Sequence, residues 1–206
     1  MEQESRLDAA TTRPGGRTAK VRAAVLAAAQ EELTENGYAG LHLDKVATRA
    51  GVGRTTVYRR WGNPCGLLID LLGELSDEWV RFEDTGSLEG DLRAMAGSLL
   101  TGLSQPQLWA VFESTIATAT SDEVAAADLR SYYDRQITAG AVAVERAIER
   151  GELPVGTDGP AVVQAVTAPF YYRLLVRREP LDARLAEQAA TAALAAARAG
   201  AFTTIP

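Results

Sequence analysis

The residues with the clearest capacity for chemistry lie between Leu43 and Trp61, in the segment LDKVATRAGVGRTTVYRRW. At helical spacing, the second half of this segment presents guanidinium and hydroxyl groups on one outer face, formed by Arg54, Thr55, Thr56, Tyr58, Arg59 and Arg60. Such groups reach base edges and phosphates when a helix lies in the major groove of DNA. The alternative interpretation is an ordinary helical hairpin whose polar face is only solvated.

Two short helices are needed to position these side chains. Val46 and Ala47 place small apolar groups on the inner side of the first helix, and Val57 anchors the second from its inner face. Gly51 supplies a tight turn between the two, with Val52 packed beneath it. Helices that cross closely over a turn containing glycine are the pattern of a helix-turn-helix.

Other kinds of site find little support in the sequence. Cys65 and His42 are the only cysteine and the only histidine, so neither a cluster of soft metal ligands nor an internal disulfide can form. We find no nucleophile–base pair and no cofactor-binding loop. We therefore expect that the protein binds no metal and no cofactor and is not an enzyme.

Charge is distributed unevenly along the 206 residues, whose formal net charge is −6. From Arg13 to Trp61 there are nine basic and four acidic residues, whereas the chain from Gly62 onward has a net charge of −9. This segregation indicates one basic face for a polyanion. The alternative is chance clustering on a solvated face.

Ala, Leu, Arg and Glu recur at helical spacing, and strand-like alternation is confined to a few residues. The sequence therefore predicts an all-α fold with about nine helices. We expect them at residues 18–36, 43–50, 54–60, 64–82, 88–103, 106–116, 121–150, 160–178 (kinked at Pro169) and 182–199.

The location of the protein is predicted from what the sequence lacks. The longest strictly apolar run, Ala23–Ala29, is far too short to span a membrane. The N-terminal residues Met-Glu-Gln-Glu-Ser-Arg show no secretory signal, and a lone cysteine suits a reducing compartment. We expect a cytoplasmic protein with no membrane partner.

Three motifs resemble the tetracycline-repressor (TetR) family: GYAGL at residues 37–41, VATRAGVG at 46–53 and TVYRRW at 56–61. The resemblance is close over residues 17–72. The segment YYRLLV at 171–176, before EPLD at 179–182, is similar to the C-terminal domain of an actinobacterial-type subgroup.

This resemblance implies a homodimeric repressor that binds palindromic operator DNA and is released by a small molecule. It implies a flexible arm at residues 1–16, a helix-turn-helix domain at 17–62 and a ligand-binding and dimerisation domain at 63–206. By position, Arg54, Thr55 and Thr56 would face bases. Tyr58 and Arg59 would hold phosphates, with Arg60 beside them and Arg17 near the backbone or minor groove.

Two positions depart from the family pattern. His42 stands where the family usually has a threonine that touches phosphate; either it donates to phosphate more strongly when protonated, or it is a neutral exposed side chain. Asn63-Pro64-Cys65 replaces a run whose lysine contacts phosphate. Cys65, near a helix N-terminus, is either a redox-sensitive thiolate or an inert thiol.

Aromatic residues of the C-terminal part come from five predicted helices. An enclosed cavity lined by a subset of them would be a small-molecule site, although core packing is the better explanation for any single one of them. The predicted lining residues are Trp79, Phe82, Trp109, Phe112, Tyr133, Phe170 and Tyr171.

The last predicted helix carries Ala189, Ala193 and Ala197 at steps of four, which suit close packing either in a dimer or within one chain. The departures at His42 and Pro64 leave a second function open. This alternative is a small-molecule-binding or scaffold protein of the same fold that has lost sequence-specific DNA binding.

Overall fold

The helical spacing of the sequence becomes nine α-helices and one π-helix in residues 14–203, the part of the chain that the computed structural model describes. An isolated bridge between Thr157 and Thr203 is the only strand-like pairing in this part. The predicted all-α fold is therefore confirmed. Residues 1–13 of the predicted flexible arm lie outside the described residues, and Pro14 already begins the first helix.

The chain divides into two compact units, with the boundary after Pro64. The first unit contains α1 (Pro14–Gly40), α2 (Leu43–Arg49) and α3 (Arg54–Trp61). Gly37 interrupts α1 with φ 63°, a left-handed conformation that glycine adopts without steric cost. α2 packs against both α1 and α3.

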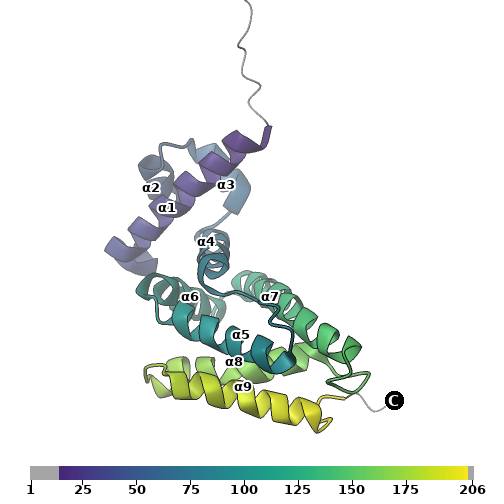
Figure 1. Cartoon of the computed structure of the whole chain (residues 1–206). Helices are drawn as coiled ribbons and strands as arrows, with labels where there is room; N and C mark the ends of the chain where they lie inside the picture. Colours follow the sequence, from purple (N-terminus) through teal and green to yellow (C-terminus); the bar gives the residue numbers. More distant parts are fainter. Residues whose placement is uncertain (1–13, 204–206) are drawn as a thin grey trace, which may run out of the picture. The chain divides into compact units, whose positions relative to one another are not determined.

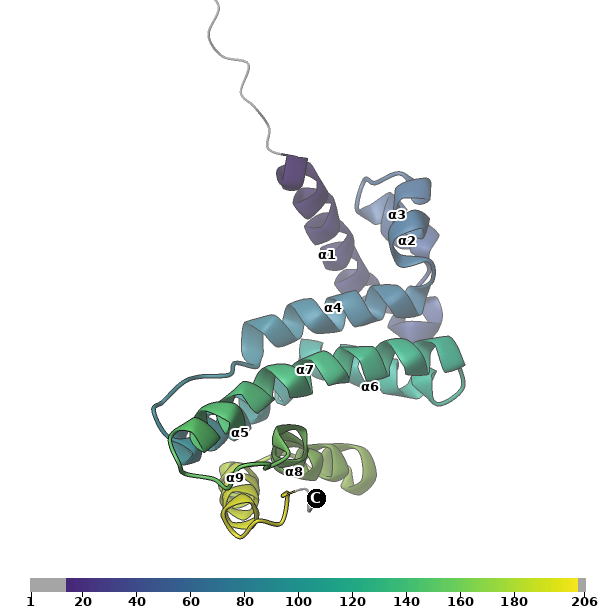
Figure 2. The same cartoon turned by 90° about the vertical axis from the view of Figure 1, so that its right-hand side faces the viewer.

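The second unit contains six α-helices and the π-helix (Figures 1 and 2). They are α4 (Pro64–Trp79), α5 (Leu88–Leu103), α6 (Pro106–Ala119), α7 (Glu123–Glu149), α8 (Gly159–Tyr171), η1 (Tyr172–Arg177) and α9 (Ala183–Arg198). α8 packs against α7 and α9, and α9 also packs against α5.

Four helices of the second unit begin at a capping side chain. The side chains of Ser87, Asp122, Asp158 and Asp182 accept hydrogen bonds from the first-turn N–H groups of α5, α7, α8 and α9. Pro106 begins α6, where its missing N–H is not needed. These caps fix the ends of the helices that enclose the interior of the second unit.

Two predictions about the helices are wrong. Phe82 lies beyond the end of α4 at Trp79, in the non-helical segment before α5. The predicted kinked helix at 160–178 is instead α8 followed by the π-helix η1. Pro169 has no N–H to donate to the carbonyl four residues earlier, so regular hydrogen bonding is already interrupted one turn before η1.

Of the two interpretations of Ala189, Ala193 and Ala197, the structure favours packing within one chain. All three are buried within the chain, on the face of α9 that packs against α5 and α8. Their small side chains allow close approach of helices of the same chain.

Candidate functional site

The turn between α2 and α3 is fixed by backbone hydrogen bonds. The N–H of Val52 donates to the carbonyl of Ala47 at 3.0 Å, and Gly51 adopts φ 64°, which a side chain would strain. Val46 and Val57 are fully buried between the helices. The two short helices therefore form a rigid helix-turn-helix that holds α3 by its apolar face.

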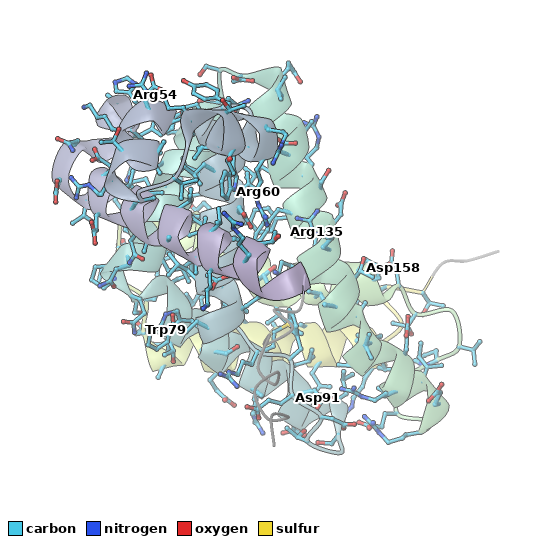
Figure 3. The ribbon with its side chains drawn as sticks, turned by 90° about the horizontal axis from the view of Figure 1, so that it is seen from above. Arg54, Arg60, Trp79, Asp91, Arg135 and Asp158 are labelled. Carbon is cyan, nitrogen blue, oxygen red and sulfur yellow. The ribbon has the colours of Figure 1, made fainter. Side chains whose placement is uncertain are left out.

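The outer face of α3 is exposed and basic. Arg54, Thr55, Tyr58, Arg59 and Arg60 are exposed, Thr56 is half-buried, and Val57 and Trp61 point inward. Figure 3 shows the positions of Arg54 and Arg60 on this helix. The guanidinium carbon of Arg60 lies 5.2 Å from the centre of the Trp61 ring, a cation–π contact.

One surface hollow brings together side chains that are far apart in the sequence. It is lined by Arg17, Thr18 and Val21 of α1, by the turn at residues 51–53, and by Thr56, Arg59 and Arg60 of α3. Four of the predicted DNA-contacting residues thus share one concave basic surface. His42 lies elsewhere, exposed at the N-terminal end of α2.

Three of the four acidic residues between positions 14 and 64 pair with a single arginine. Arg49 of α2 pairs with Glu32 at 2.8 Å, Glu35 at 2.6 Å and Glu31 at 3.2 Å, all on α1. Hydrogen bonding to Arg49 lowers the pKa of Glu35. Outside this cluster, residues 14–64 carry seven basic side chains and one acidic side chain, Asp44. Asp44 pairs with Arg54 at 3.5 Å, so this part of the chain keeps a surplus of positive charge while one predicted base-contacting side chain has an acidic partner.

The structure decides between the two interpretations of Cys65. The thiol is buried at the start of α4, and burial raises its pKa to about 11. Asp128 and Asp122 add to this shift because their charges disfavour a thiolate. A reactive thiolate is therefore the wrong interpretation, and the thiol is neutral at physiological pH.

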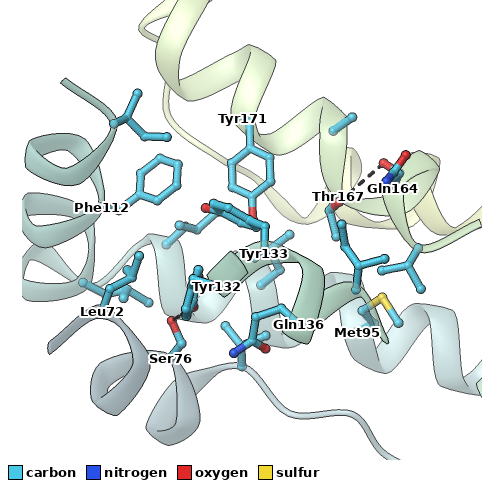
Figure 4. Close-up of a pocket in the computed structure, with 18 of the residues that line it drawn as sticks. Leu72, Ser76, Met95, Phe112, Tyr132, Tyr133, Gln136, Gln164, Thr167 and Tyr171 are labelled. Atoms are coloured by element: carbon cyan, nitrogen blue, oxygen red, sulfur yellow. Dashed lines mark hydrogen bonds between the residues drawn. The ribbon is translucent and has the colours of Figure 1, made fainter. Parts of the chain in front are cut away.

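A cavity of about 440 Å³ lies inside the second unit, between helices α4, α5, α6, α7, α8 and η1 (Figure 4). Pockets that hold small molecules commonly have such volumes and such apolar walls. The aliphatic side chains of the wall are Leu72, Val80, Met95, Leu99, Leu103, Leu108, Ile116, Ile137, Val163, Ala168 and Leu175.

Tyrosines form the polar part of the cavity wall. The hydroxyl of Tyr132 donates to Ser76 Oγ on α4 at 2.6 Å, and both groups are buried. Tyr171 points from α8 towards Tyr133 on α7, with the two rings edge-on and their centres 5.8 Å apart (Figure 4). Burial raises the pKa of Tyr171 to about 12 and also raises that of Tyr133, so both hydroxyls stay neutral.

The predicted aromatic residues divide into two groups. Phe82, Phe112, Tyr133 and Tyr171 line the cavity, whereas Trp79, Trp109 and Phe170 do not. Phe170 is fully buried in the core, and Trp109 packs on Phe112 at 5.4 Å between ring centres. An aromatic side chain that points into the core therefore need not line the cavity.

Several lining residues were missed from the sequence, above all Ser76, Tyr132 and Gln136. The sequence did contain a signal for Tyr132 and Gln136. Tyr132, Tyr133, Gln136 and Ile137 fall on one face of α7 at helical spacing, which would have grouped Tyr132 and Gln136 with Tyr133.

Neither a metal-binding cluster nor a membrane-spanning helix is found in the described residues. Among residues 14–203, no three His, Cys, Asp or Glu side chains lie close enough together to hold a metal ion. None of the helices in this range is both long and apolar enough to cross a bilayer.

Two protein-family models match the chain. Residues 25–71 match the bacterial regulatory proteins of the tetR family, and residues 82–193 match the tetracyclin repressor-like C-terminal domain. The first match covers the helix-turn-helix, and the second covers most of the helices around the cavity.

Characterised proteins and solved structures agree with this. The chain is 35% identical to the HTH-type transcriptional regulator AqdR of Rhodococcus erythropolis, over 71% of this chain and 70% of AqdR. It is 31% identical to the DNA-binding transcriptional repressor TetR of Mycobacteroides abscessus, over 78% of this chain and 84% of that protein. The crystal structure of the TetR family transcription regulator SCO0332 superimposes with a TM-score of 0.72 at 29% identity, covering 85% of this chain and 97% of SCO0332.

The helix-turn-helix, the helical second unit and these similarities lead to one assignment. The chain belongs to the TetR family of transcriptional regulators and carries its DNA-binding domain.

Proposed function

We propose that this regulator is a repressor that binds palindromic operator DNA as a homodimer and leaves it when a small molecule enters the cavity. The observation that carries the proposal is the cavity of about 440 Å³ in the unit that follows the helix-turn-helix. An empty apolar space of this size lowers stability, so its presence favours a role in binding. The repressor named among the relatives supports the direction of regulation.

The exposed face of α3 supplies the DNA contacts in this proposal. Arg54, Thr55 and Thr56 contact base edges from the first turn of the helix. Tyr58 and Arg59 hold phosphates, because a helix that enters the major groove has backbone on both sides. Arg60 adds positive charge, and Arg17 and His42 reach the DNA backbone from α1 and α2.

A symmetric dimer accounts for a palindromic operator, because each subunit reads one half-site. Tyr172 and Val176 of η1 are 58% and 66% exposed, unusually high values for large apolar side chains. We place the dimer contact on this face and not on the buried alanine stripe of α9. Exposed apolar side chains that lie together on one segment are typical of protein contacts.

Release from DNA requires that the ligand bind two states of the dimer with different affinity. The ligand favours the state in which the separation of the two α3 helices no longer matches the half-site spacing. Tyr132 and Ser76 connect the cavity to α4, because their hydrogen bond joins the cavity wall on α7 to that helix.

An operator selection tests the proposal. Purified full-length protein is mixed with random duplex DNA at moderate salt, and the bound DNA is sequenced. We expect a palindrome that is lost in Arg54→Ala and retained in Arg184→Ala, a matched control whose side chain is exposed on α9. A folded dimer that enriches no sequence would contradict the proposal and favour a small-molecule binder that has lost DNA recognition.

A further inference from the structure

The cavity wall contains no charged side chain among the described residues. Its twenty lining residues include no Asp, Glu, Lys, Arg or His. A ligand ion in this space would lose its water shell without gaining a counter-ion. Burying an ion without a counter-ion therefore disfavours charged ligands in this space.

Several polar groups of the wall already have partners. Tyr132 donates to Ser76, and Thr167 Oγ1 donates to the carbonyl of Gln164 at 3.4 Å. Tyr133 and Tyr171 pack edge-on against each other, with ring centres 5.8 Å apart.

Two side-chain amides of the wall, those of Gln164 and Gln136, have no hydrogen bond among the described residues, because Gln164 accepts only through its backbone carbonyl. Gln164 is exposed to solvent, so the amide that is better enclosed is that of Gln136. Its side chain is half-buried on α7, one turn after Tyr132, and lines the cavity (Figure 4). Within residues 14–203, no hydrogen bond or ion pair reaches its amide. The amide offers one acceptor oxygen and two N–H donors to whatever fills the space.

We propose that the effector is an uncharged, mainly aromatic or aliphatic molecule with one carbonyl or hydroxyl group that hydrogen-bonds to the Gln136 amide. This inference rests on the proposed function, because it names the ligand class of the same cavity. The apolar walls bury the hydrocarbon part. Gln136 supplies the specificity that apolar contacts lack, because an unmatched polar group in a desolvated site disfavours the wrong ligand.

Four naphthalene compounds of similar size test the ligand class: 2-acetylnaphthalene, 2-ethylnaphthalene, 2-naphthoate and 2-naphthylmethylammonium. Binding to the full-length protein is measured by isothermal titration calorimetry and by thermal shift at pH 7.5. We expect the ketone to bind most tightly and both ions to bind at least tenfold more weakly. Equal binding of either ion would overturn the inference.

The role of Gln136 is tested with Gln136→Met, which keeps the length of the side chain and removes the amide. We expect it to weaken the ketone about two- to tenfold and to leave 2-ethylnaphthalene unchanged, because one neutral hydrogen bond is lost. Gln107→Met, exposed on α6, is the matched control. Equal weakening of both compounds would overturn the contact, and failure of all four compounds to bind would overturn the ligand class.

Operator binding distinguishes a failure of this inference from a failure of the proposed function. A ketone that binds the cavity without weakening the complex with a selected operator supports the ligand class and contradicts ligand-controlled release. An ion that binds and releases the operator overturns the ligand class and leaves the proposed function standing.

Discussion

Replacing both hydroxyls of the Tyr132–Ser76 pair should cost less than the sum of the two single replacements. Tyr132 is 6% exposed, Ser76 is 5% exposed, and their oxygens are 2.6 Å apart. The singles, Tyr132→Phe and Ser76→Ala, each remove this bond and leave one hydroxyl buried without its partner. The double variant leaves neither hydroxyl.

The magnitude follows from these contacts. A buried neutral hydrogen bond contributes ~1 kcal/mol net, and the orphaned hydroxyl adds ~1 kcal/mol, so each single variant loses about 2 kcal/mol. The double variant loses the bond but leaves no orphaned hydroxyl, so it should lose only about 1 kcal/mol, which makes the coupling energy about 3 kcal/mol. At ~2–4 °C per kcal/mol for a chain of this size, each single lowers Tm by roughly 4–8 °C.

Urea denaturation followed by circular dichroism measures the free energies of unfolding, with equal m values as the check for two-state behaviour. Tyr58→Phe is the matched control, because the Tyr58 side chain is exposed on α3 and its hydroxyl is not required in the core. It should change stability by less than about 0.5 kcal/mol. Additive losses in the double variant would refute the reasoning, because they would mean that the two hydroxyls act independently.

Four further predictions concern other parts of the molecule. Arg59→Ala should reduce the slope of log K against log salt for operator binding by about 0.9 per subunit, as one phosphate contact is lost, whereas Arg184→Ala should not change it. Ile116→Trp should fill part of the cavity and weaken 2-acetylnaphthalene by calorimetry without changing operator affinity. Phe170→Ala should cost about 3–5 kcal/mol in urea denaturation, because this ring is fully buried. Burial raises the pKa of Cys65 to about 11, so its stabilising contribution is complete below pH 9 and is lost as the pH rises from 9 to 11. Cys65→Ala should remove that component, and an unchanged alkaline profile would show that Cys65 does not contribute to it.

The DNA-binding unit could be predicted closely because its information is local. The spacing of Val46, Gly51 and Val57 specifies two short helices and a tight turn within about a dozen residues. Burial of one side of α3 then determines which residues face outward. The family and the all-α fold, both predicted from the sequence, are confirmed.

The cavity could be predicted only in outline because it depends on packing between distant helices. Helical period identifies Phe170 and Phe112 equally as inward-facing residues. Only the structure shows that Phe170 is surrounded by other side chains, whereas Phe112 borders empty space. The missing information is the distance between helices, which a pattern within one helix does not contain.

The prediction for Cys65 shows two opposing effects on one group. A helix N-terminus favours a thiolate because the partial positive charge of its N–H groups stabilises an anion. Burial opposes this by removing the water that would solvate the charge, and Asp128 and Asp122 oppose it further. The raised pKa shows that burial is the larger effect. Burial comes from tertiary packing, which the sequence near Cys65 did not reveal.

The segment from Tyr171 through the π-helix η1 borders both the ligand cavity and the proposed dimer contact. Tyr171 and Leu175 line the cavity, while Tyr172 and Val176, the next residue in each case, are exposed on the face where we place the dimer contact. A ligand that displaces Tyr171 therefore acts on a segment that also contacts the partner subunit. Because π-helical turns lack the regular hydrogen bonding of an α-helix, this segment adjusts at a lower cost than the neighbouring α-helices. We expect variants at Tyr172 to change operator release by a bound ligand even though this side chain does not line the cavity.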